Sequence, residues 1–161
     1  MISFNGDEMK QNPKLKLIQE NMQPGAFTAH GFLGNDSRAL KDILRTDENA
    51  VAKMGLTHKD IATRMRYFTE VGKEAPDSVV IMDGIFEVLV DDHRGFIPCP
   101  FADYAHELKS NTKLINRELD REIYWSDLNI HMIEEHGFYE GEGSFFRTDP
   151  VDLAKILGLF E

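Results

Sequence analysis

The sequence predicts an α+β domain in which N-terminal helices, a small antiparallel sheet and C-terminal helices follow one another. Apolar side chains recur at helical spacing as far as about Val71, after which the period changes to two in VVIM and IFEVLV. These two runs flank Asp83-Gly84, a dipeptide typical of a two-residue hairpin turn. Helical spacing returns after Trp125. We expect strands near 78–82, 85–91, 95–99, 112–117 and 121–125.

Each helix expected before the sheet has a recognisable start. The starts are Asn12 before Pro13, Asp36, the pair Thr46 and Asp47, and Thr57 with Asp60 in a capping-box arrangement. This pattern predicts four helices, the third of them short and ending at Gly55. Residues 103–110 are expected to form one or two helical turns. The last two helices are predicted over Ser126–His136 and Pro150–Leu159.

Length and composition favour one globular domain over residues 13–161, after a flexible lead-in of residues 1–12. The first residues lack an apolar core and no long apolar run follows, so we expect neither a secretory signal nor a membrane partner. The single cysteine points to a reducing cytoplasm. The net charge of −10 disfavours nucleic-acid binding, and a homodimer through exposed strand edges stays open as an alternative.

The run HMIEEH contains two histidines that invite interpretation as a metal site. At 100° per residue, His131 and His136 lie 140° apart on a straight helix, which predicts that they do not bind one ion together. Metal-binding pairs on one helix are usually four residues apart. We expect His131 to face water between Asp127 and Glu135. A surface cation held by His131 and Glu135 is the weaker alternative.

Two polar residues of the same helix fall on its apolar side and must find hydrogen-bond partners there. Asn129 and His136 could therefore line a partly polar pocket beside helix 126–136, although His136 could equally cap the last-turn carbonyls. Arg147 is the one cation of GEGSFFR; it could bind a carboxylate ligand, and its plainer role is to pair with a neighbouring acid such as Asp149. The candidate ligand-binding residues are Trp125, Asn129, His136, Tyr139 and Arg147.

Cys99 lies between two prolines, which stiffen the backbone around its thiol. A thiol of lowered pKa could act as a nucleophile, with His136 or His93 as its base, or bind a metal together with His93. Arg94, in the turn before Cys99, is a positive group that could lower the pKa of the thiol. The plainer interpretation is a small buried apolar side chain.

Two further motifs suggest nucleic-acid or phosphate binding. Residues 48–66 resemble a helix-turn-helix around Gly55, so DNA binding is an alternative, but Val51 and Arg64 fit the pattern poorly. The run GEGSFFR matches no phosphate-binding spacing, and Gly141 and Gly143 are expected to supply turn geometry.

Four segments, GFLGNDSRAL, GLTHKDIATRM, RGFIPCPF and WSDLNIHMIEEHGFYEGEGSFFR, together resemble small bacterial proteins without an assigned activity, over about residues 26–150. This resemblance implies no catalytic or binding residue. The expected function is a binding module for a small-molecule ligand. A thiol-dependent enzyme, a divalent-metal protein and a DNA-binding protein remain the alternatives.

Overall fold

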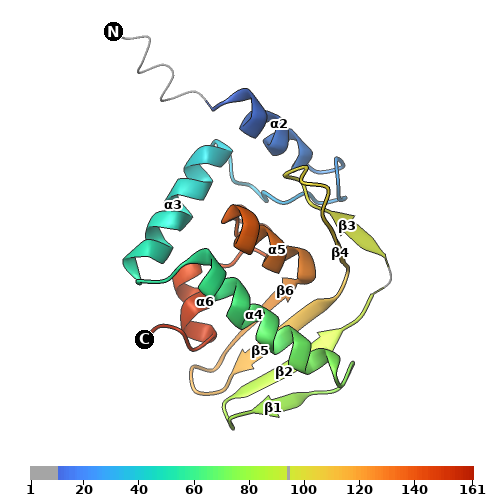
Figure 1. The fold of residues 1–161 in the computed structure, drawn as a ribbon, viewed down its shortest axis with the longest axis vertical. Helices are drawn as coiled ribbons and strands as arrows, with labels where there is room; N and C mark the ends of the chain where they lie inside the picture. The colour runs from blue at the N-terminus through green and yellow to red at the C-terminus, as the bar shows by residue number, and fades with distance from the viewer. Residues whose placement is uncertain (1–10, 94) are drawn as a thin grey trace.

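The computed structural model describes residues 11–93 and 95–161, and within them it shows a mixed α+β arrangement (Figure 1). The helices are α2 (Pro13–Asn21), α3 (Leu40–Lys53), α4 (His58–Lys73), α5 (Asp127–His136) and α6 (Pro150–Ile156). The strands are β1 (Val80–Met82), β2 (Phe86–Asp91), β3 (Phe96–Pro98), β4 (His106–Leu108), β5 (Asn111–Asn116) and β6 (Arg121–Ser126). The predicted α+β class is confirmed.

The strands form two antiparallel sheets. A four-stranded sheet has the order β1-β2-β5-β6, and β3 pairs only with β4. Asp83 and Gly84 join β1 to β2 with positive φ at both residues, which is the backbone of the hairpin turn that the sequence predicts. The expected strand at 95–99 exists, but it lies in the small sheet. Its partner is β4, so the prediction of helical turns at 103–110 is wrong.

Local capping signals account for most helix starts. Asn12 caps α2, while Thr57 with Asp60 and Ser126 with Asn129 form complete capping boxes at α4 and α5. The expected break before Thr46 and Asp47 is wrong, because Leu40–Lys53 is one continuous helix. Asp36 does not cap it either.

Asp36 instead accepts hydrogen bonds from its neighbour Arg38, at 3.0 and 2.7 Å. The Arg38 guanidinium thereby holds the pKa of the Asp36 carboxyl at about 2, below its usual value. The expected lead-in, residues 1–12, lies outside the described residues apart from its last two positions.

Two hydrophobic cores meet at α5, which lies between the sheet and the α2–α3 layer (Figure 1). Ile130 and Ile133 join the core formed by α4, α6 and the four-stranded sheet. Leu128 and Met132 join the core that contains α2, α3 and the segment after β3. Because apolar side chains of α5 enter both cores, this helix is held from two sides and its remaining side chains are fixed in direction.

Among the described residues, no helix combines the length and the apolar character that a membrane crossing requires.

Candidate metal centre

The segment between β3 and β4 is a tight loop that crosses the end of α5. The backbone N–H of Cys99 donates to the carbonyl of Ala105 at 2.9 Å, and that of Ala102 donates to the carbonyl of Cys99 at 3.1 Å. Ala102 and Tyr104 have φ of 59° and 66°, a left-handed conformation that side chains other than glycine rarely adopt. These two residues turn the chain on either side of Asp103, so the loop presents its carboxylate towards α5.

Asp103 brings the two histidines of α5 together. His131 and His136 each place Nε2 2.7 Å from Oδ2 of Asp103, and their ring centroids are 5.6 Å apart. Oδ1 of Asp103 accepts a third hydrogen bond from the backbone N–H of Ala105 at 3.0 Å. Both rings therefore reach one carboxylate, although the helical projection sets them 140° apart.

This difference from the projection has a geometric cause. A helical projection compares the directions of Cα atoms, and it neglects the reach of an imidazole and the position of a group lying outside the helix. His131 also does not stand between Asp127 and Glu135 in water. Its side chain is only 15% exposed, beneath the loop that carries Asp103. Glu135 is exposed and takes no part in the cluster.

Cys99 completes a group of four potential metal ligands. One ligand atom from each of Cys99, Asp103, His131 and His136 lies within 4.8 Å of each of the others. Around a tetrahedral zinc ion, with bonds of about 2.0–2.3 Å, ligand atoms are separated by roughly 3.3–3.8 Å. The four side chains would thus have to move by about an ångström or less each to close around one ion.

Protonation in this cluster follows from burial and hydrogen bonding. Burial acts to raise the pKa of Asp103, but hydrogen bonds from His136, Ala105 and His131 outweigh it and hold that pKa well below its usual value. Burial raises the pKa of the Cys99 thiol to about 12, against a hydrogen bond from the backbone of Phe101 that favours the thiolate. The site therefore presents an ionised Asp103 and a neutral thiol.

Two further residues lie next to the histidine rings. The ring of Phe101 is stacked on that of His136, with centroids 4.0 Å apart and planes at 5°. Oε1 of Glu107 lies 3.9 Å from Nδ1 of His131, on the side of the ring opposite Asp103. With an ion bound, Nε2 would no longer donate to Asp103, and a carboxylate on the Nδ1 side would then favour the tautomer that leaves Nε2 free to bind the metal.

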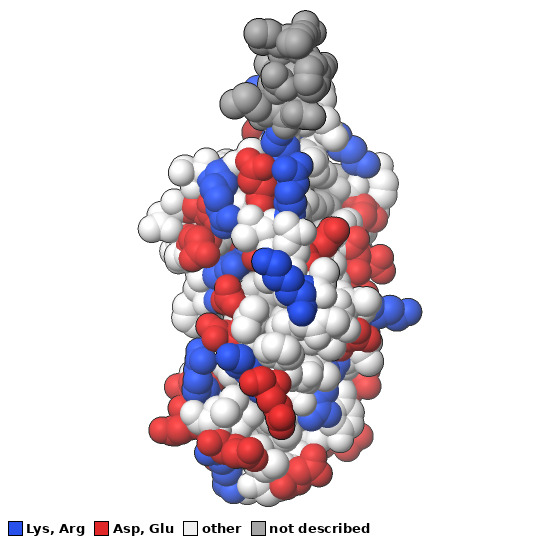
Figure 2. All heavy atoms as spheres, turned by 90° about the vertical axis from the view of Figure 1, so that its left-hand side faces the viewer, with Lys and Arg blue, Asp and Glu red and all other residues white. Residues whose placement is uncertain are grey.

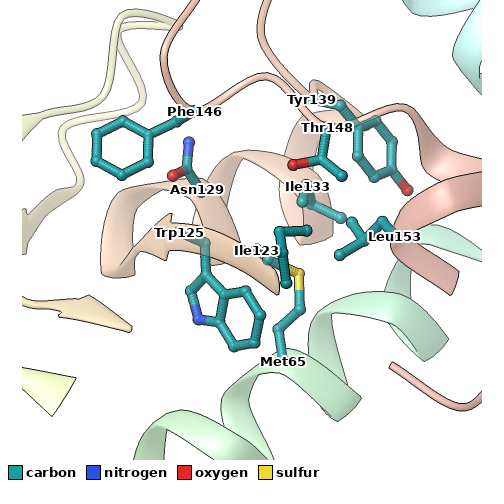
Figure 3. Close-up of a pocket in the computed structure, with 9 residues that line it drawn as sticks. All are labelled: Met65, Ile123, Trp125, Asn129, Ile133, Tyr139, Phe146, Thr148 and Leu153. Carbon is teal, nitrogen blue, oxygen red and sulfur yellow. The ribbon is translucent and has the colours of Figure 1, made fainter. Parts of the chain in front are cut away.

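Three of the candidate ligand-binding residues line an interior cavity (Figure 3). Trp125, Asn129 and Tyr139 face it from β6, α5 and the segment after α5, but its volume is only about 10 Å³. Such a space holds at most one water molecule. Trp125 Nε1 donates to Thr69 at 2.8 Å, and the hydroxyl of Tyr139 lies 2.8 Å from Nδ1 of His58. Both side chains are therefore part of the packed interior.

The other candidates have separate environments. Asn129 donates to Glu140, whereas His136 and Cys99 belong to the cluster around Asp103, so the structure divides the expected polar pocket between two places. The side chain of Arg147 is 9% exposed and pairs with Asp47 of α3, at 2.6 and 3.0 Å. Its expected pairing with Asp149 is wrong, because Asp149 instead caps α6.

His93 binds Asp91 at the surface and has no part in the cluster around Cys99. Arg94, which precedes Cys99 in the sequence, lies outside the described residues. The helix-turn-helix-like segment 48–66 spans the end of α3 and the start of α4, on the face shown in Figure 2. Acidic and basic side chains are interspersed across this face without a continuous basic surface.

Sequence reasoning missed Asp103, the residue on which the cluster depends. The available signal was the pair of spacings: Cys99 and Asp103 are four residues apart, in a loop opened by Pro98-Cys99-Pro100, and the two histidines are five apart. Neither spacing is specific alone. No family model, curated protein or solved structure matches the chain, so the site has to be interpreted from its own geometry.

Proposed function

We propose that this protein binds a divalent transition-metal ion, with zinc as the preferred metal, through Cys99, Asp103, His131 and His136. The observation that carries this proposal is the convergence of one sulfur, two imidazole nitrogens and one carboxylate oxygen within 4.8 Å of one another. The four residues come from two segments about 30 positions apart, and strained backbone at Ala102 and Tyr104 flanks Asp103.

The kind of metal follows from the donor atoms. Calcium and magnesium prefer six or more oxygen ligands, and this cluster offers one carboxylate. Thiolate and imidazole ligands in a four-coordinate set favour zinc, with iron, cobalt or nickel as ions of related preference. A dication next to Cys99 would also stabilise the thiolate that burial otherwise disfavours.

The position of the cluster supports a structural role for the ion. Four protein ligands fill a tetrahedral coordination sphere and leave no open position for a substrate. Cys99 is 2% exposed and belongs, with Phe101, to the core that α5 shares with α2 and α3. An ion bound there would tie the loop between β3 and β4 to α5. Burial of Cys99 correspondingly gives the thiol-enzyme alternative no support.

Metal analysis of purified protein tests the proposal. The protein, expressed without a polyhistidine tag and purified without chelator, is expected to contain close to one zinc per chain by mass spectrometry. Loading the stripped protein with cobalt should produce a sulfur-to-metal charge-transfer band, which disappears in Cys99→Ser. We expect His131→Asn and His136→Asn to weaken zinc binding at least about tenfold, since losing even an outer partner costs 10–100-fold.

Two control variants separate this site from other surface groups. Glu135→Gln removes an exposed acid beside His136, and His106→Asn removes an exposed histidine of β4; both should bind zinc as the wild type does. Zinc binding below one ion per ten chains after loading, or equal affinity in the wild type and His136→Asn, would contradict the proposal.

A further inference from the structure

A wide groove is lined by residues other than the four metal-ligand candidates. It has a volume of about 1170 Å³ and is bounded by residues 27–34, β3, the first turn of α5 and residues 140–146. None of Cys99, Asp103, His131 or His136 lines it. This volume suits a small organic molecule, in contrast to the interior cavity of Figure 3.

Glu140 is the buried charged group of this groove. It lines the groove, yet only 3% of its surface is exposed. Asn129 Nδ2 donates to Oε2 and Ser144 Oγ donates to Oε1, each at 2.5 Å. A carboxylate accepts about four hydrogen bonds, and these contacts give each oxygen one donor, so each oxygen retains capacity for another.

The backbone around Glu140 is held rigidly in an unfavourable conformation. Glu140 has φ of 65°, in the left-handed region. The chain on either side is locked to residues 32–35: Gly141 N donates to the carbonyl of Phe32, and Asn35 N donates to that of Glu142, both at 2.9 Å. A Cβ at Gly141 would lie 2.5 Å from the carbonyl oxygen of Leu33. This close backbone packing maintains the strain at Glu140, and strain of this kind often marks a functional position.

Aromatic side chains line the same groove. Phe27, Phe96 and Phe145 all line it and all are exposed, Phe145 to 77%. Phe145 meets Phe146, another lining residue, edge to face with ring centroids 4.9 Å apart. Exposed rings next to a buried carboxylate combine an apolar surface with a negative charge and with ring faces that attract cations.

We propose that this groove binds an organic cation, a protonated amine carried on an aromatic or apolar body, with Glu140 as its counter-ion. Lys109 also lines the groove and would repel such a ligand, but it is exposed and its charge is screened by water and salt. The charge of Glu140 is buried and is screened much less, so the carboxylate determines which ligand charge is preferred.

Proton release should accompany binding. Burial raises the pKa of Glu140 to about 7, against the hydrogen bonds from Ser144 and Asn129. Two charged side chains contact the backbone of this loop: Arg147, paired with Asp47, donates to the Glu140 carbonyl at 3.0 Å, and Asp36 accepts from the Glu142 N–H at 3.1 Å. His30, His93 and Lys109 also line the groove. Near pH 7 a fraction of Glu140 is therefore protonated, and a bound cation would shift it to the carboxylate.

Three probes that share one ring test the proposal. Benzylamine, benzyl alcohol and benzoate carry a positive, a neutral and a negative group, and each is titrated into the full-length protein by NMR. We expect benzylamine to bind tightest and benzoate weakest, with shifts at Glu140, Ser144 and Phe145. In Glu140→Gln, benzylamine binding should weaken about tenfold or more, the effect of one lost charge-assisted hydrogen bond.

The matched control is Glu142→Gln, which removes an exposed carboxylate two residues away that does not line the groove. Its benzylamine affinity should equal that of the wild type. If Glu140→Gln does not fold, the ¹³C chemical shift of the Glu140 carboxyl in the wild type provides the test. It should move towards the value of an ionised carboxylate when benzylamine is added and should not change when benzoate is added. Equal affinity for benzylamine and benzoate, or an unmoved Glu140 resonance, would overturn the proposal.

Discussion

The ring of Phe101 lies parallel to the imidazole of His136, with centroids 4.0 Å apart. Phe101 is itself buried and meets Phe138 edge to face, so it is held against the histidine by the core. The stack restricts rotation of His136 and directs Nε2 towards Asp103. Phe101 is thus a positioning residue for the proposed metal ion and touches no metal itself.

Replacing Phe101 by leucine should therefore weaken metal binding while keeping an apolar core residue. We expect the Kd for zinc to rise about 10–100-fold, the range typical of residues that orient a ligand. Competition with a chromogenic chelator measures this Kd. Phe145→Leu, which alters an exposed aromatic elsewhere, serves as the control. If Phe101→Leu binds zinc as tightly as the wild type, the stack has no positioning role.

The buried ion pair between Arg147 and Asp47 fixes the segment after α5 against α3. The two side chains are 9% and 4% exposed, and two hydrogen bonds join them. Arg147→Met would leave the carboxylate of Asp47 buried without its partner. Because an uncompensated buried charge is costly, we expect the free energy of unfolding to fall by about 3–5 kcal/mol, measured by urea denaturation at pH 7.

A double-mutant cycle separates the pair from the cavity left by the substitution. Asp47→Leu combined with Arg147→Met removes both charges, and it should cost less than the sum of the two single substitutions. Arg121→Met is the exposed comparison: Arg121 lies 3.4 Å from Asp152 at the surface, and its loss should cost about 1 kcal/mol or less. If the losses of unfolding free energy from the two single substitutions simply add up in the double variant, Asp47 and Arg147 have no pairing energy.

Features that depend on neighbouring residues could be predicted from the sequence. The capping box at Thr57 and the Asp83-Gly84 turn are satisfied within a few residues, so their patterns are informative alone. The box between Ser126 and Asn129 is equally local, but the position of Asn129 on the apolar side of its helix favours a pocket residue instead when only the sequence is considered. Local signals gave a wrong helix boundary where contacts between residues distant in the sequence determine the structure. Asp47 looks like a helix start, yet it lies inside α3, because Arg147, a hundred positions away, satisfies its carboxylate.

The candidate site shows the same limit more strongly. The direction of each histidine on α5 follows from the helical period, but the position of Asp103 depends on a loop with two left-handed residues, Ala102 and Tyr104. Neither residue is glycine, and no local pattern indicates such a conformation. The pairing of β3 with β4 places that loop across α5, and pairing between strands separated by a loop is a tertiary property.

Stability should depend on pH through Glu140. Its pKa is raised from 4.5 to about 7, so between these pH values the folded chain holds a proton that the unfolded chain has released. Because the folded state binds more protons, the free energy of unfolding falls as pH rises through this window. At about 1.4 kcal/mol per pH unit, the loss attributable to Glu140 should total about 3 kcal/mol, and it should level off above pH 7.

Glu140→Gln isolates this contribution from every other titrating group. Glutamine can still accept from Asn129 and hydrogen-bond to Ser144, but it does not ionise. Urea denaturation of both proteins from pH 4.5 to 8 gives the difference in unfolding free energy at each pH. We expect the wild type to lose stability relative to Glu140→Gln as pH rises. The unfolding free energy of Glu142→Gln, a change at an exposed position, should vary with pH as that of the wild type does. A difference that stays constant from pH 4.5 to 8 would mean that Glu140 ionises near its ordinary pKa, and that burial in the loop does not disfavour its charge.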